Sequence, residues 1–180
     1  MFPTRIDVKV FRGLAKLAMA ICCLCAPSAH AEETTPTEGW LSPPSDWSVR
    51  HWTIHRSLYT KHWDPVPEHN NNQNLIGVEL GFDRKWVAGA ALMDNSFDQP
   101  SQLVFVGKIW PLFGAEHFYG KIMGGFLHGY REPYEDKIPL NQLGVAPVII
   151  PSLGFNYRML VLESAFGGLA AVKVTVGVRF

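Results

Sequence analysis

Cysteine is scarce in this chain and absent beyond residue 25. The three cysteines, Cys22, Cys23 and Cys25, all lie in an N-terminal segment that has the features of a cleaved export signal. Once that segment is removed, the remaining chain has neither a disulfide nor a thiolate. This absence excludes cysteine nucleophiles and thiolate metal sites.

The N-terminal segment itself predicts export. Four arginines and lysines lie within 5–16, an apolar run covers 17–26, and Ala29-His30-Ala31 has the small-x-small pattern of a signal-peptide cleavage site. We therefore expect residues 1–31 to be a signal peptide. The mature chain would then have 149 of the 180 residues and begin at Glu32.

Two further absences narrow the function. Removal of the signal takes four of sixteen basic and one of sixteen acidic residues, which leaves 12 against 15 and a net charge of −3. A nucleic-acid partner is not expected, because such partners are bound by strongly basic faces. No run of 18 apolar residues remains, so any membrane crossing must be made by strands. One domain is expected at this length.

The segment 172–180 is a clear strand signal, because apolar residues alternate there with polar or small ones. One face would carry Val172, Val174, Val176, Val178 and Phe180, and the other Lys173, Thr175, Gly177 and Arg179. Such alternation is expected of a strand between hydrocarbon and a barrel interior. A final aromatic also resembles the assembly signal of bacterial outer-membrane proteins. An edge strand of a soluble sandwich is the competing interpretation.

The mature chain contains eight such strand candidates, separated by turn residues. They cover 51–59, 74–82, 85–94, 101–110, 117–129, 145–156, 159–165 and 170–180. We therefore predict an all-β fold, an eight-stranded antiparallel transmembrane β-barrel over 51–180, monomeric and in the cell outer membrane. Residues 32–50 would form an N-terminal periplasmic segment. Short connections alternate with longer ones, which predicts periplasmic termini and surface loops at 60–73, 94–100 and 130–144.

Glycine and other small residues dominate the expected inner face of this barrel. The glycines that we expect to line the bore are Gly77, Gly81, Gly89, Gly120 and Gly124. A narrow apolar bore of this kind would accept an acyl chain, with Gly81, Gly89 and Gly120 near its periplasmic floor. A bore filled by the protein's own side chains is the alternative.

Proline interrupts one strand candidate, since Pro147 and Pro151 both lie within 145–156. Proline donates no ladder hydrogen bond, and hydrocarbon cannot replace it. The interruption indicates either a local bulge or a side opening through which a lipid enters the bore.

Groups suited to acyl transfer lie in two of the expected surface loops. His62 is expected to be the general base, Ser96 its hydroxyl partner, and Asn95 or Asp94 the residue that orients the site. His69 is the alternative base, and solvated loop residues without a catalytic role are the alternative interpretation. The spacing of the two histidines matches no common metal-ligand pattern, so neither a metal nor another cofactor is expected.

Several of these segments resemble the lipid A palmitoyltransferase (PagP) family. The resemblance rests on the Pro-apolar-apolar-apolar-Pro segment 147–151, on 90–97 with its Asp and Ser, and on His62 near the top of the first strand. It implies that a palmitoyl chain is moved from a phospholipid donor to lipid A, through a gate framed by Pro147 and Pro151. The family places Asp directly before Ser, whereas Asn95 intervenes here.

Two other functions stay open at this point. A small outer-membrane barrel can be structural or lipid-binding without any catalysis. A lipid A deacylase would use a similar pair of histidine and serine, but the His-x-Ser-Asn pattern of that family is absent here.

Overall fold

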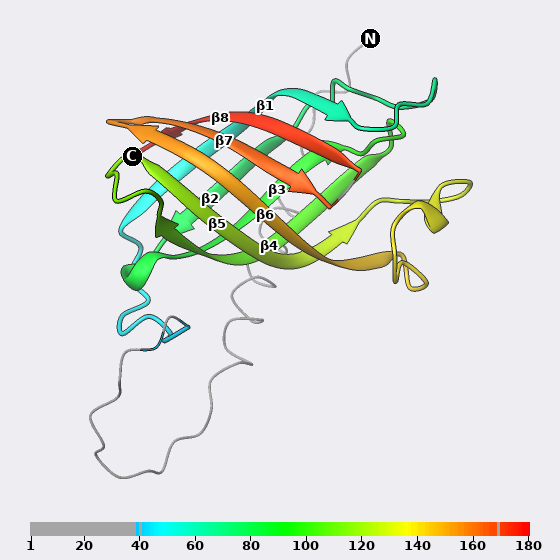
Figure 1. The fold of residues 1–180 in the computed structure, drawn as a ribbon. Coiled ribbons are helices and arrows are strands. Elements are labelled where there is room, and N and C mark those ends of the chain that lie inside the picture. The colour runs from blue at the N-terminus through cyan, green and yellow to red at the C-terminus, as the bar shows by residue number, and fades with distance from the viewer. Residues whose placement is uncertain (1–38, 40, 169) are drawn as a thin grey trace, which may run out of the picture.

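Eight antiparallel strands close on themselves to form a barrel (Figure 1). The computed structural model describes Gly39 and residues 41–168 and 170–180. The strands are β1 (His51–His62), β2 (Ile76–Gly81), β3 (Trp86–Asp94), β4 (Pro100–Pro111), β5 (Phe118–His128), β6 (Val145–Tyr157), β7 (Leu160–Gly167) and β8 (Ala171–Arg179). Within the described residues, no helix is long and apolar enough to span a membrane.

The predicted fold class is confirmed, and each strand lies within about three residues of its expected position. The largest difference is in β1, which continues to His62 because its last residues pair with the start of β8. His62 therefore belongs to a strand rather than to a loop. The predicted signal peptide, residues 1–31, lies outside the described residues.

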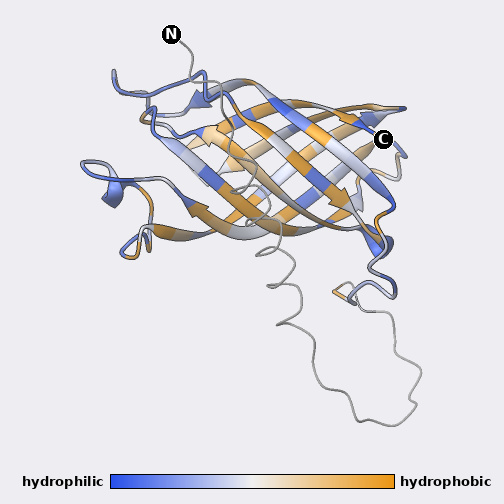
Figure 2. Cartoon of the chain, turned by 180° about the vertical axis from the view of Figure 1, so that it is seen from behind, coloured by the Kyte–Doolittle hydropathy of each residue, from blue (hydrophilic) through white to orange (hydrophobic). Residues whose placement is uncertain are grey.

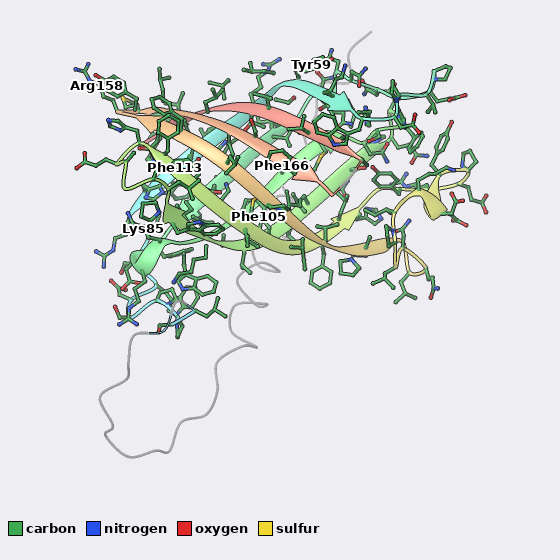
Figure 3. The ribbon with its side chains drawn as sticks, viewed as in Figure 1. Tyr59, Lys85, Phe105, Phe113, Arg158 and Phe166 are labelled. Atoms are coloured by element: carbon green, nitrogen blue, oxygen red, sulfur yellow. The ribbon has the colours of Figure 1, made fainter. Side chains whose placement is uncertain are left out.

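The two ends of the barrel differ in their connections. At one end, here called the turn end, strands are joined by tight connections at 82–85, 112–117 and 158–159, and Phe180 hydrogen-bonds to the backbone of Trp52. Lys85, Phe113 and Arg158 mark this end in Figure 3. The opposite end, here called the loop end, carries the longer connections at 63–75, 95–99 and 129–144.

The outer face of the barrel wall is apolar. Hydrophobic residues alternate along the strands, and hydrophilic residues gather at the two ends (Figure 2). Large apolar side chains exposed on this face include Ile54, Ile76, Ile122, Phe126, Ile149, Leu153, Leu160, Leu162 and Val178. A wall of this kind is what membrane barrels present to hydrocarbon.

The strand register corrects the inner face expected for β5. Residues that pair directly in an antiparallel sheet share one face, and Lys121 pairs with inward-facing Ile109 and Ser152. Gly120 and Gly124 therefore face outward, and the prediction that they line the bore is wrong. An added Cβ at Gly124 would meet no atom within 4 Å. Glycines occupy both faces of β5, so alternation alone did not distinguish them.

The other expected bore glycines do face inward, at Gly77, Gly81 and Gly89. Gly81 is covered by the ring of His51, and an added Cβ at Gly89 would lie 2.5 Å from the ring of Phe105. Of the three, only Gly77 borders the large cavity described below. Neither Gly81 nor Gly89 therefore forms an open floor for a bound chain, because aromatic rings already fill the space beside them.

The sheet is incomplete between β6 and β7. β6 pairs with β5 from Val145 to Phe155, but it pairs with β7 only from Ser152 to Tyr157. Pro147 and Pro151 lie in the part without a β7 partner, and both face outward. Their missing N–H groups account for a weakened ladder here. The expected interruption of the wall is thus present at the loop end of β6.

The turn-end half of the bore is charged, which contradicts the expectation of an apolar bore. Lys121 Nζ lies 2.7 Å from Glu79 Oε2 and 2.6 Å from Glu163 Oε2, and Tyr119 donates a 3.0 Å hydrogen bond to Glu163. These side chains come from β5, β2 and β7 and are at least 95% buried. These strands are far apart in the sequence, so the sequence alone did not indicate that the charged side chains would form ion pairs.

This ion cluster, Glu79, Lys121 and Glu163, predicts a large effect of Lys121→Met. The substitution leaves two buried carboxylates without their cation, and breaking a buried pair costs about 3–5 kcal/mol. We expect the free energy of unfolding in urea, measured in lipid vesicles, to fall by about that amount. Lys61→Met, on the exposed outer face of β1, is the matched control. An equal effect of both substitutions would contradict the prediction.

Candidate functional site

A β-bulge in β1 determines which way His62 points. Ser57 pairs with Thr175, but Tyr59 pairs with Val174, so Leu58 is an extra residue in β1. Below the bulge the odd-numbered residues face the bore, and above it the even-numbered residues Thr60 and His62 do so. Regular alternation from Thr53 would have turned His62 outward. The bulge thus brings the predicted base into the mouth of the barrel.

His62 forms two hydrogen bonds, one at each ring nitrogen. Its Nδ1 lies 2.8 Å from Oδ1 of Asn71, and its Nε2 lies 2.9 Å from Oγ of Ser96. An amide oxygen only accepts hydrogen bonds, so Nδ1 carries the proton. Nε2 then has a free lone pair, and the Ser96 hydroxyl donates to it. The predicted pair of His62 and Ser96 is therefore in direct contact, and His62 is 3% exposed.

The loop that carries Ser96 is joined to the loop after β1. Gln73 Nε2 donates to Ser96 Oγ at 3.2 Å, and the backbone N–H of Asn70 donates to the Ser96 carbonyl at 2.8 Å. The Asn70 side chain also donates to Asp98 at 2.9 Å. Ser96 thus has one donor aimed at its hydroxyl oxygen while the hydroxyl proton points to His62. This is the arrangement of a serine whose oxygen is held for attack.

Asn95 and Asp94 do not orient His62, and the prediction that one of them does is wrong. Asn95 Oδ1 accepts from the backbone N–H groups of Phe97 and Gln99, so this side chain shapes the 95–99 turn. Asp94 Oδ2 accepts from Asn74 at 3.2 Å. The orienting amide is Asn71 instead. Three consecutive asparagines occupy 70–72, and the sequence alone did not indicate which one meets the imidazole.

His69, the alternative base, stacks on His62 with ring centroids 4.1 Å apart. Its Nδ1 accepts a 3.3 Å hydrogen bond from the backbone of Val66, so this nitrogen is not directed at Ser96. Partial withdrawal from water lowers the pKa of His69, and the neighbouring His62 lowers it further. Phe97 packs edge-on against His69 and stacks on Tyr134 at 4.0 Å. Ring contacts thus run from His62 through His69 and Phe97 to Tyr134.

A cavity of about 780 Å³ extends from Ser96 down the bore to the ion cluster. Its upper wall is largely apolar, and a buried cluster of Leu75, Ala91 and Leu103 is packed there by Met93, Phe105, Leu127, Val148 and Ile150. Phe105, near the middle of the barrel in Figure 3, lies with its ring centroid 6.0 Å from Lys121 Nζ. The apolar part of the cavity, here called the chamber, therefore ends at Phe105.

Pro147 and Ile149 also border the cavity, although both face outward. The cavity thus approaches the interrupted part of the wall between β6 and β7. Pro151 does not border it.

The described residues contain no group of three or more His, Cys, Asp or Glu side chains placed to hold a metal ion. What the arrangement offers is a hydroxyl, an imidazole that can take its proton, an amide that fixes the imidazole, and an apolar space beside them. Those are the groups of nucleophilic acyl chemistry.

No protein-family model matches the sequence, and no curated protein matches it. Among solved structures it is similar to the outer membrane protein Ail of Yersinia pestis, determined in a phospholipid bilayer nanodisc. That similarity covers 72% of this chain and 99% of Ail, with 13% sequence identity and a TM-score of 0.43.

Asn71→Leu should release the His62 ring from its tautomer. Without an acceptor at Nδ1, the ring loses the hydrogen bond that favours the tautomer with its proton on Nδ1. Nitrogen chemical shifts of ¹⁵N-histidine-labelled protein should show one tautomer of His62 in the parent and a mixture in Asn71→Leu. Asn72→Leu is the control, because the hydrogen-bond partners of the imidazole are Asn71 and Ser96. An unchanged tautomer in Asn71→Leu would exclude Asn71 as the orienting residue.

Proposed function

We propose that this barrel is an outer-membrane acyltransferase that moves a palmitoyl chain from a phospholipid to lipid A. The observation that carries the proposal is the hydrogen-bonded set of Ser96, His62 and Asn71 at the mouth of an apolar chamber. A purely structural barrel does not require a buried imidazole with a serine on one nitrogen and an amide on the other. The resemblance of 90–97 and 147–151 to the PagP family supports the same reaction.

The chemistry follows from the hydrogen-bond directions. Ser96 Oγ attacks the ester carbonyl of the phospholipid, and its proton passes to Nε2 of His62. When the ester bond breaks, the departing glycerol oxygen takes that proton and leaves as lysophospholipid. A hydroxyl of lipid A then attacks the acyl-serine, gives its proton to His62, and Ser96 recovers it as the new ester forms. Gln73 donates to Ser96 Oγ and so helps to hold the attacking oxygen in position.

The interrupted wall supports entry of lipid from the side. A diacyl phospholipid carries its ester groups at the membrane surface, and the gap between β6 and β7 lies at the loop end of the wall. The cavity reaches Pro147 and Ile149 at this gap, and Ile149 is 76% exposed on the outer face. One acyl chain can thus pass from hydrocarbon into the chamber without crossing water.

The outer-membrane location rests on the apolar belt of the barrel and on the predicted signal peptide. A closed barrel leaves no unpaired sheet edge in hydrocarbon apart from the short interruption at β6. The loop end, with Ser96 and His62, would face the outer leaflet, in which lipid A resides.

His62→Ala and Ser96→Ala should each lower acyl transfer by about a hundredfold or more, because general-base assistance contributes about that much. Mass spectrometry of lipid A from cells that produce each variant measures the gain of one palmitoyl mass. His69→Ala is the control and should have a milder effect. A parent protein that leaves lipid A unchanged would favour a non-catalytic barrel, and a loss of acyl mass would favour a deacylase.

The bulge allows a paired deletion test of the same proposal. Deleting Lys61 shifts His62 to an outward position opposite Val172, so transfer should fall at least as far as in His62→Ala. Deleting Leu58 removes only the extra residue and leaves His62 opposite Ala171, so most activity should remain. Heat-modifiable migration in gels checks that both barrels fold. Equal activity of the two deletions would show that the orientation of His62 does not matter.

A further inference from the structure

A second lysine faces the bore, separate from the ion cluster. Lys173 in β8 lies opposite Thr60, one inward position below the pairing of His62 with Ala171. Its side chain borders the cavity, and its Nζ lies 3.2 Å from Sδ of Met93 on β3. The Lys173 side chain therefore extends from β8 toward β3 at the top of the chamber. It lies between the pair of His62 and Ser96 and the apolar space below.

Lys173 lacks the anionic partner that Lys121 has. No acidic side chain among the described residues forms an ion pair with it. The carboxylate of Asp94 attracts it only from beyond ion-pair distance, and Asp94 Oδ2 accepts from Asn74. A thioether sulfur is a weak acceptor and does not neutralise a cation. An ammonium group held in an apolar bore in this way calls for an anion from outside the chain.

The neighbouring hydroxyl is also unsatisfied. Thr60 is 1% exposed, and its Oγ1 has no hydrogen-bond partner. Buried hydroxyl groups are normally hydrogen-bonded, so an unpaired one on a residue that lines the cavity indicates a missing acceptor. Thr60 and Lys173 are cross-strand neighbours on the inner face, so one small group can meet both.

We propose that Lys173 and Thr60 bind the carboxylate of a long-chain fatty acid whose hydrocarbon tail occupies the chamber. The two carboxylate oxygens match one ammonium group and one hydroxyl. The tail then lies against Leu75, Ala91 and Leu103 and ends above Phe105. This binding site does not depend on the proposed acyl transfer, because it holds a free acid and requires no reaction.

Carboxyl-¹³C-labelled palmitate tests the site with the whole barrel in phosphatidylcholine nanodiscs. A resonance of bound palmitate, separate from that of palmitate in the lipid, should appear and saturate. Lys173→Met keeps the length of the side chain and removes the charge, so the apparent Kd should rise about tenfold or more. Thr60→Val should give a smaller rise. Unlabelled hexadecanol, which has no carboxylate, should displace the label only at about tenfold higher concentration than unlabelled palmitate.

Lys61→Met is the matched control, because Lys61 follows Thr60 in β1 and faces outward. It should leave palmitate binding unchanged. Lys173→Met is expected to fold, since it removes an unpaired charge, and heat-modifiable migration confirms this. Absence of a saturable signal, equal displacement by hexadecanol, or unchanged affinity in Lys173→Met would each overturn the proposal.

Ser96→Ala separates this inference from the proposed function. One outcome is that Ser96→Ala binds palmitate with an affinity that Lys173→Met lowers, while the parent protein transfers no acyl group. In that case the proposed reaction is wrong and the fatty-acid site is supported. If acyl transfer requires His62 and Ser96 but Lys173→Met leaves the apparent Kd for palmitate unchanged, only the fatty-acid site is wrong.

Discussion

The alternation of side chains in a closed antiparallel sheet is the constraint on which the site depends. Every residue of the wall must face either hydrocarbon or the bore, and a shift of one residue exchanges the two. The extra residue Leu58 causes this exchange once, in β1, and it affects only the residues of β1 that follow it. Below it, Thr53 and His55 face inward in step with the rest of the sheet; above it, His62 does. His62, at an even position, thus reaches the same bore that the lower part of β1 lines from odd positions.

The same alternation explains how much of the structure was predictable. The eight strands were found because apolar residues recur with period two on the outer face. Inward-facing residues were predicted less well, because β5 has glycine on both faces and only the register with β4 and β6 assigns Gly120 and Gly124 to the outside. His62 and Ser96 were found from their residue types and loops. Asn71 was missed because three adjacent asparagines are equivalent until the loop is folded.

The charged and apolar halves of the bore have different physical roles. In the turn-end half, Lys121 holds carboxylates from β2 and β7 and so ties three strands of the wall together. In the loop-end half, the ladder between β6 and β7 is interrupted and the cavity is open. The interruption of the ladder thus lies in the half of the barrel that does not contain the ion cluster.

Hydrogen bonds within and between two loops fix the position of Ser96. Asn95 fixes the turn that carries it, and Asn70 joins that turn to the loop after β1 through both its backbone and its side chain. Asn71 and Gln73, on the same loop as Asn70, then set the imidazole and the serine oxygen. One loop thus supplies hydrogen-bond partners to both members of the pair. The distance between Nε2 and Oγ is therefore held by the protein itself before any ligand enters.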